Sequence, residues 1–192
     1  MTTLAPTIYT RAFPRAAGWL RDLILIVLGA LFVAALAQVK VVLPFTPVPL
    51  TGQTFAVLLL GATLGSKRSA ASVVLYIALG ALGLPVFAGG ASGIAYLSGA
   101  TLGYLIGFVV AAYIIGLLAE RGLERNVRTS LIPFFVGTVI IYICGVAWLA
   151  IVLGSLSKAI AAGLLPFLVG DLIKLMLAAV ALPAAWRILS RA

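Results

Sequence analysis

The chain has 192 residues, of which 64% are hydrophobic and 9% are charged, whereas a water-soluble domain has about 45–50% apolar and about 25% charged residues. This composition excludes a water-soluble globular protein and predicts an integral membrane protein in a lipid bilayer. The 13 Lys and Arg residues outnumber the 4 Asp and Glu residues, but they flank apolar runs and form no patch with aromatic residues, which favours lipid headgroups over nucleic acid as their partner.

Apolar runs long enough to cross a membrane, about 17–25 residues each, predict the helices of the protein. We expect one all-α domain over residues 1–192, a six-helix transmembrane bundle with segments at 20–43, 51–65, 69–84, 99–119, 131–153 and 166–187. The second and third segments are short, and only SKRS separates them. This sequence predicts a tight hairpin that exposes Lys67 and Arg68 to headgroups.

The basic residues predict the orientation of these six segments. Lys40 and Lys158 fall on one side of the membrane and Lys174 lies within the sixth segment. The other side holds Arg11, Arg15, Arg21, Lys67, Arg68, Arg121, Arg125, Arg128, Arg187 and Arg191. The positive-inside rule therefore places both termini in the cytoplasm of a multi-pass cell-membrane protein. The first segment also has features of a cleaved secretory signal, but its removal would break this charge pattern, so we expect it to be retained.

Small residues at four-residue intervals predict close helix packing in two segments. Gly99, Gly103 and Gly107 share one face of the fourth segment and predict a packing groove inside the protein. In the first segment, Ala30 and Ala34 have the same spacing, and their face suits an internal helix or a partner protein equally well. On the outer side, the three prolines of PFTPVPLTGQT predict a stiff loop, and GLPVFAGGASG is rich in Gly and uncharged. We expect both loops to be structured lids or linings, with plain connectors as the alternative.

Catalytic and cofactor-binding motifs are missing from the sequence. GATLGSKRS lacks the spacing of a phosphate-binding loop, because three residues and not four lie between its glycines and Ser66 precedes the Lys. One Cys and no His exclude a disulfide framework, a zinc site and a haem. Apart from Asp22 at the very start of the first segment, Asp171 is the one acid inside a segment, which argues against a paired-Asp protease. We therefore expect no enzymatic activity, no metal and no cofactor.

Two charges in the sixth segment, Asp171 and Lys174, are the strongest candidates for a binding site. Each costs about 2.5–3.5 kcal/mol at the centre of a membrane helix, whereas each Leu, Ile, Val or Phe returns about 0.3–0.6 kcal/mol. Nine such residues between Phe167 and Leu182 therefore offset one charge and not two. Their i, i+3 spacing places both on one face, turned toward protein or a watery cavity in the outer half of the membrane. This pattern predicts a ligand site, with a structural ion pair as the alternative.

Several stretches together resemble a known family. Residues 47–90, GATLGYLIGF, YICGVAWLA and PFLVGDLIK resemble the BioY family, the biotin-binding S components of energy-coupling factor (ECF) vitamin transporters. The resemblance runs in consistent order from about residue 39 to residue 182. It departs at Ala100 and Leu102, where the family stretch is expected to read closer to GPTGGYL.

The resemblance implies that the protein captures biotin from outside and works with an ECF transmembrane coupling protein and two ATP-binding subunits. It also implies that the face carrying Ala30 and Ala34 docks the coupling protein. The charged pair suits the ureido ring or the carboxylate of biotin, and we expect both side chains to engage one end of the ligand. Further lining residues are expected to be Gln53, Thr51 and Tyr104. The alternatives are an S component for another small vitamin and a membrane assembly protein without a transport role.

Overall fold

The structure is a computed structural model that describes residues 3–13 and 17–191, together with their side chains except those of residues 190 and 191. Arg15 lies outside the described residues, and so does the side chain of Arg191. The helices are α1 (Leu4–Ala12), α2 (Gly18–Ala37), α3 (Gln53–Leu64), α4 (Ser66–Ala81), α5 (Ile94–Leu97), α6 (Leu102–Glu120), η1 (Leu123–Arg125), α7 (Val127–Leu153), α8 (Leu156–Gly163) and α9 (Leu168–Arg191). The strands β1 (Lys40–Val41) and β2 (Leu50–Thr51) pair antiparallel.

Each of the six expected segments contains a helix, namely α2, α3, α4, α6, α7 and α9. Among the described residues, four helices are long and apolar enough to span a membrane: Gly18–Ala37, Leu102–Glu120, Val127–Leu153 and Leu168–Leu189. The helix α3 is apolar but has only 12 residues. The protein is therefore a multi-pass helical membrane protein whose helices differ in length.

Several boundaries differ from the expected ones, and two of these differences have identifiable reasons. The first segment was expected to continue to residue 43, but α2 ends at Ala37 because residues 40–41 pair with residues 50–51 as a short hairpin. The SKRS stretch was expected to form a turn, but it lies in the first turn of α4. Gly65 alone connects α3 to α4, and its φ of +84° is a conformation that favours glycine.

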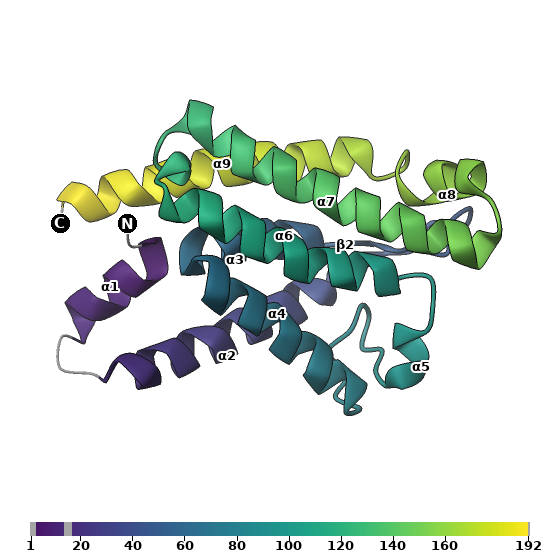
Figure 1. Ribbon diagram of the computed structural model, residues 1–192, viewed down its shortest axis with the longest axis horizontal. Helices are drawn as coiled ribbons and strands as arrows, with labels where there is room; N and C mark the ends of the chain where they lie inside the picture. The colour runs from purple at the N-terminus through teal and green to yellow at the C-terminus, as the bar shows by residue number, and fades with distance from the viewer. Residues whose placement is uncertain (1–2, 14–16, 192) are drawn as a thin grey trace.

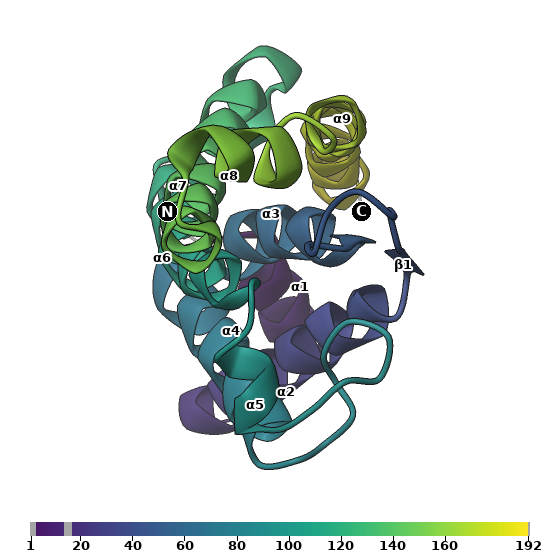
Figure 2. The same ribbon diagram turned by 90° about the vertical axis from the view of Figure 1, so that its right-hand side faces the viewer.

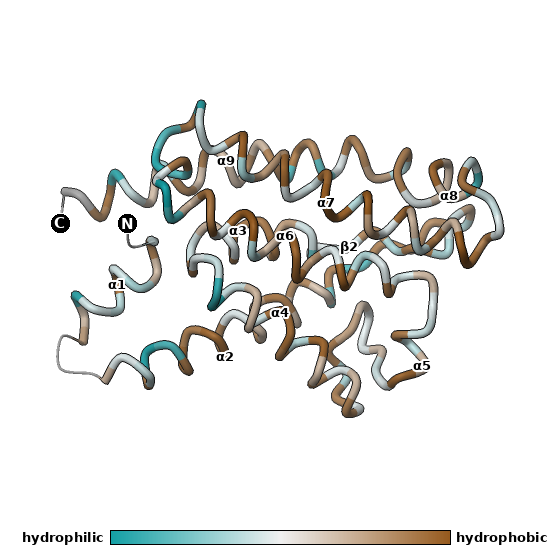
Figure 3. Tube along the Cα trace, in the orientation of Figure 1, coloured by the Kyte–Doolittle hydropathy of each residue, from teal (hydrophilic) through white to brown (hydrophobic). Residues whose placement is uncertain are grey.

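The described ends of the chain lie at one end of the bundle, with α1 beside them, while the β-hairpin, α5 and α8 lie at the other end (Figure 1). At the centre is α3, which packs against α6 and α9, and α4 joins α2 to α6. Figure 2 shows α3 surrounded by these helices in a view along the bundle. Figure 3 shows hydrophobic residues along the length of the helices and hydrophilic residues gathered toward the end with the termini.

The glycines of α6 explain how closely α6 approaches α7. A Cβ at Gly103 would collide with the Trp148 side chain and the Cys144 backbone, and a Cβ at Gly107 would lie 3.0 Å from the Ile141 Cα. The predicted packing groove is therefore confirmed for these two glycines. Gly99 precedes α6, and its carbonyl instead accepts a hydrogen bond of 2.9 Å from the Trp148 indole.

Candidate functional site

The first two turns of α9 hold Asp171 and Lys174 together. The Lys174 Nζ lies 2.8 Å from the Asp171 Oδ1, so the i, i+3 pair forms an ion pair. The Asp171 side chain is 7% exposed and the Lys174 side chain is 18% exposed. The expected pairing of the two charges on one face is therefore confirmed, and it offsets part of the cost of carrying two isolated charges in an apolar environment.

Residues near the start of α3 complete the hydrogen bonding of Lys174. Its ammonium donates to the Thr51 carbonyl oxygen at 2.9 Å and to the Thr54 Oγ1 at 2.8 Å. The Thr54 hydroxyl in turn donates to the Asp171 Oδ1 at 3.0 Å. A threonine hydroxyl has one hydrogen and two lone pairs, so it can accept from Lys174 and donate to Asp171 at the same time. The three side chains thus form a closed triangle between α3 and α9.

The second carboxylate oxygen is bound by α7. The Tyr142 hydroxyl donates to the Asp171 Oδ2 at 2.6 Å, which is short, as expected for a hydroxyl bound to a charged acceptor. Asp171 therefore receives hydrogen bonds from three side chains that come from α3, α7 and α9. This carboxylate joins three helices at one point, and Lys174 balances its charge.

A second set of polar contacts lies beside the ion pair. Gln53 donates from Nε2 to the Tyr76 hydroxyl at 2.6 Å and accepts at Oε1 from the Thr51 hydroxyl at 3.0 Å. The Tyr104 hydroxyl donates to the Gly163 carbonyl at 2.6 Å, which ties α6 to the end of α8. These bonds fix the orientation of side chains that lie around the charged pair.

A cavity of about 40 Å³ brings these groups together. It is enclosed by α3, α6, α7, α9, the β-hairpin and α5, and its polar lining comprises Thr51, Gln53, Thr54, Tyr96, Thr101, Tyr104, Tyr142, Asp171 and Lys174. A second cavity of about 330 Å³ adjoins it toward the hairpin end and includes Lys40 and Thr46 in its lining. Three residues, Pro49, Tyr96 and Thr101, line both cavities and separate them.

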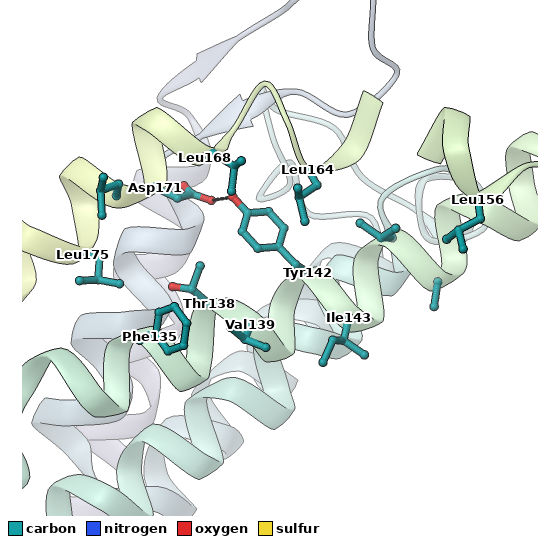
Figure 4. A pocket seen from close by; sticks show the side chains of 13 residues that line it. Phe135, Thr138, Val139, Tyr142, Ile143, Leu156, Leu164, Leu168, Asp171 and Leu175 are labelled. Carbon is teal, nitrogen blue, oxygen red and sulfur yellow. Dashed lines mark hydrogen bonds between the residues drawn. The ribbon is translucent and has the colours of Figure 1, made fainter. Parts of the chain in front are cut away.

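On its other side, the polar cavity is separated from an apolar groove of about 550 Å³ between α7, α8 and α9. Figure 4 shows this groove, with the Tyr142 hydroxyl pointing at the Asp171 carboxylate. Both residues line the groove as well as the cavity. Groove residues such as Phe135 and Ile143 are more than half exposed, as suits side chains that face lipid. The Tyr142–Asp171 hydrogen bond is therefore part of the wall between the polar site and the bilayer.

All five residues expected at the site, Asp171, Lys174, Gln53, Thr51 and Tyr104, line the same cavity. Thr54 and Tyr142, which also line the cavity, were not expected, and neither was Tyr76, which binds Gln53. The sequence does contain a signal for Thr54 and Tyr142, because a carboxylate inside a membrane segment needs hydrogen-bond donors, and hydroxyl groups in neighbouring segments can supply them. Periodicity alone did not show which hydroxyls would face Asp171.

The two alanines expected to dock a partner are mostly inside the fold. Ala30 is 1% exposed, and Ala34 is half-buried and packs against the core. At the neighbouring Gly29, an added Cβ would lie 2.5 Å from the Ser72 Oγ, so this face of α2 is in tight contact with α4. The exposed face of α2 carries larger apolar residues, including Leu23, Leu28 and Leu31.

These features define a class of protein, a multi-pass helical membrane protein with a polar cavity enclosed near one end of its bundle. A model of the BioY family matches residues 5–191. The chain belongs to the BioY family.

Relatives and a solved structure agree with this assignment. The chain is 38% identical to a biotin transporter BioY of Rhizobium etli, over 83% of this chain and 89% of that protein. It is 47% identical to a probable biotin transporter BioY of Pyrococcus horikoshii, over 77% of this chain and 86% of that protein. Its fold matches a crystal structure of the S-component for biotin from an ECF-type ABC transporter with a TM-score of 0.80 and 27% identity, over 88% and 92% of the two chains.

Proposed function

We propose that the protein takes up biotin, as the integral membrane subunit that captures the vitamin from outside the cell. The observation that carries this proposal is the Asp171–Lys174 pair, held by Thr54 and Tyr142 at a cavity of a BioY-family chain. Intramembrane charges are costly and are retained chiefly where they have a function. The names of the relatives support biotin as the ligand.

The chemistry of biotin fits the groups in this cavity. Its ureido ring offers two N–H donors and a polarised carbonyl, its thioether ring and tail are apolar, and the tail ends in a carboxylate. The Asp171 carboxylate is suited to accept from a ureido N–H, and the Lys174 ammonium is suited to bind the carbonyl or the tail carboxylate. The two charged atoms lie 2.8 Å apart, which supports contact of both side chains with one end of the ligand.

The volume of the cavity adds a requirement to this proposal. About 40 Å³ holds only about three waters, whereas small-molecule sites usually have about 300–1,000 Å³. The adjoining cavity of about 330 Å³ supplies the missing space if Pro49 and Tyr96 move apart. Biotin therefore enters from the end that carries the β-hairpin and α5, and these two segments shift to admit it.

The proposed topology has six membrane-crossing helices and both termini in the cytoplasm. The segments α1, the connection between α6 and α7 and the end of α9 carry Arg residues in the sequence, and they lie toward the end of the bundle that carries the described ends of the chain, which supports this orientation (Figure 1). At 1.5 Å per residue, the 12 residues of α3 span about 18 Å, less than the roughly 30 Å of bilayer hydrocarbon. Neighbouring helices enclose α3, so its short length is compatible with a crossing.

The proposed partners are an ECF transmembrane coupling protein and two ATP-binding subunits. The burial of Ala30 supports a packing role inside the fold, where α2 contacts α3 and α4, and not a docking contact of its own. We therefore place docking on the exposed face of α2, with Ala34 at its edge. This face runs along the lipid-facing side of the helix, where a second membrane protein can reach it.

Binding of radiolabelled biotin to the purified protein in nanodiscs tests the proposal. The parent protein should bind saturably, and Asp171→Asn and Lys174→Met should reduce affinity by more than about tenfold, since each loses a charge-assisted hydrogen bond. Lys158→Met is the matched control, because Lys158 is exposed on α8 and lies outside the cavity lining. The proposal is contradicted if the parent shows no saturable binding, if the two site variants bind biotin as tightly as the parent and the control, or if the protein prefers another vitamin in a ligand panel.

A further inference from the structure

A separate polar cavity of about 380 Å³ lies at the end of the bundle that carries the chain termini. Residues of α1, the start of α2, the start of α4 and the end of α6 enclose it. Its lining comprises Thr3, Pro6, Thr7, Thr10, Arg11, Arg21, Arg68 and Glu120. None of these residues lines the site proposed for biotin.

Three guanidinium groups give this cavity its chemical character. The Asp22 Oδ1 accepts from the Arg21 Nε at 3.0 Å and from the Arg68 Nε at 2.8 Å, so one carboxylate holds both side chains in place. Each of these contacts uses the Nε position and leaves terminal guanidinium nitrogens for further contacts, although the Arg68 Nη1 also donates to the Leu64 carbonyl at 3.4 Å. This arrangement orients two cations beside the same space.

The remaining charged groups leave the cavity positive. The Arg11 Nη1 donates to the Leu189 carbonyl at 2.9 Å, which holds α1 against the end of α9. The Glu120 Oε1 accepts from both the Ser66 backbone N–H at 2.7 Å and its hydroxyl at 2.9 Å, so this oxygen is directed at the first turn of α4. Among the described residues and with Asp22 included, three positive and two negative side chains surround the cavity, a net charge of +1.

The elements around the cavity carry exposed apolar side chains as well. On α1 and directly after it, Ile8 is 46% and Phe13 is 59% exposed. On the first turns of α2, Trp19 is 71% and Leu23 is 51% exposed. Tryptophan is enriched where the bilayer meets water, and short helices with one apolar face lie in that same layer. The cavity is therefore at the depth of the lipid headgroups, with apolar side chains placed to contact acyl chains.

From these observations we propose that this cavity binds the phosphate of an anionic phospholipid. Guanidinium groups bind phosphate oxygens through paired, charge-assisted hydrogen bonds. The choline group of a zwitterionic lipid would add a positive charge beside three arginines, so phosphatidylglycerol is favoured over phosphatidylcholine. Asp22 joins α2 to α4 through Arg68. A bound headgroup would connect α1 to these two helices.

The test uses the full chain and native mass spectrometry of the protein titrated with phosphatidylglycerol or phosphatidylcholine. The double variant Arg11→Gln/Arg21→Gln removes two of the three guanidinium groups. Arg128→Gln is the matched control, because Arg128 is exposed at the start of α7 and lies outside the cavity lining. We expect the double variant to bind phosphatidylglycerol about tenfold more weakly, and the control to bind it as the parent does. Biotin binding by each variant reports whether the fold is intact.

Three results would overturn this assignment. Equal affinity of the parent and the folded double variant for phosphatidylglycerol would show that these arginines are not the site. Equal affinity of the parent for phosphatidylcholine would show that acyl chains alone hold the lipid. Complete displacement of phosphatidylglycerol by millimolar inorganic phosphate would show that the site takes a free anion. If the parent protein binds phosphatidylglycerol but not biotin, the proposed function is refuted and the lipid site is not.

Discussion

Removing Asp171 and Lys174 separately and together distinguishes their effect on stability from their effect on binding. Asp171→Asn keeps the shape of the side chain but leaves the Lys174 charge, 18% exposed, with neutral acceptors only, namely the Thr51 carbonyl, the Thr54 hydroxyl and the amide oxygen that replaces the carboxylate. Loss of one partner of a buried ion pair costs about 3–5 kcal/mol. We expect about 3 kcal/mol here, because Lys174 keeps two hydrogen bonds.

Lys174→Met should cost less, about 2 kcal/mol, since Asp171 keeps its bonds from Tyr142 and Thr54. The double variant leaves no unpaired charge, and replacement of a buried ion pair by uncharged groups is often close to neutral. It should therefore lie within about 1 kcal/mol of the parent, which gives a coupling energy of about 4 kcal/mol.

Equilibrium unfolding in mixed micelles, followed by circular dichroism, measures these free energies, and biotin binding is measured on the same samples. All three variants should lose biotin binding, including the stable double variant. If the double variant is as unstable as the sum of the two single variants, the charges do not compensate each other and the reasoning is wrong. If it is stable and still binds biotin, the pair is structural only.

Three further predictions concern other parts of the protein. Burial raises the pKa of Glu124, which is fully buried outside the membrane-spanning helices, so its contribution to stability is present at low pH and is lost as pH rises above about 4.5. Glu124→Gln should stabilise the protein at pH 7 and remove this part of the fall in its unfolding temperature as pH rises above about 4.5. Gly103→Val should destabilise the protein by about 1–3 kcal/mol in the same unfolding assay, because the added carbons collide with α7. Gly18→Ala is the control and should have little effect, because among the described residues its Cβ would meet only the Arg21 guanidinium nitrogen, at 3.9 Å. Equal effects of the two substitutions would contradict the packing argument. Phe87→Ala should lower the free energy of unfolding by about 3–5 kcal/mol and weaken biotin binding. The buried Phe87 ring stacks on the Tyr96 ring, with 4.7 Å between the ring centroids, and so supports the wall of the cavity. Unchanged biotin binding in a folded variant would show that Phe87 does not support this wall.

The sequence predicted the helices better than their ends. Long apolar runs place a helix in each expected segment because hydrocarbon solvent demands internal backbone hydrogen bonding. The end of α2 at Ala37 was not predictable from hydropathy, since residues 38–43 are apolar apart from Gln38 and Lys40. Pairing with residues 50–51 is a contact between distant residues that composition does not reveal.

The candidate site was predictable in part, for a similar reason. The cost of charge in a membrane segment identified Asp171 and Lys174, because that cost depends only on local sequence and bilayer thickness. The role of Tyr142 depends on how α7 lies against α9, and the burial of Ala30 depends on how α2 lies against α3 and α4. Small-residue spacing marks a face that packs closely but does not say whether its partner lies in the same chain.

The hydrogen bond between Tyr142 and Asp171 also limits how the protein can move. Separation of α7 from α9 at this point would break the 2.6 Å contact and expose a carboxylate and an ammonium to lipid, at about 2.5–3.5 kcal/mol for each charge. The opposite wall, formed by Pro49, Tyr96 and Thr101, carries no formal charge and adjoins a second cavity. The wall formed by α7 and α9 should therefore stay fixed while the opposite wall moves. Ligand exchange should leave the distance between α7 and α9 unchanged.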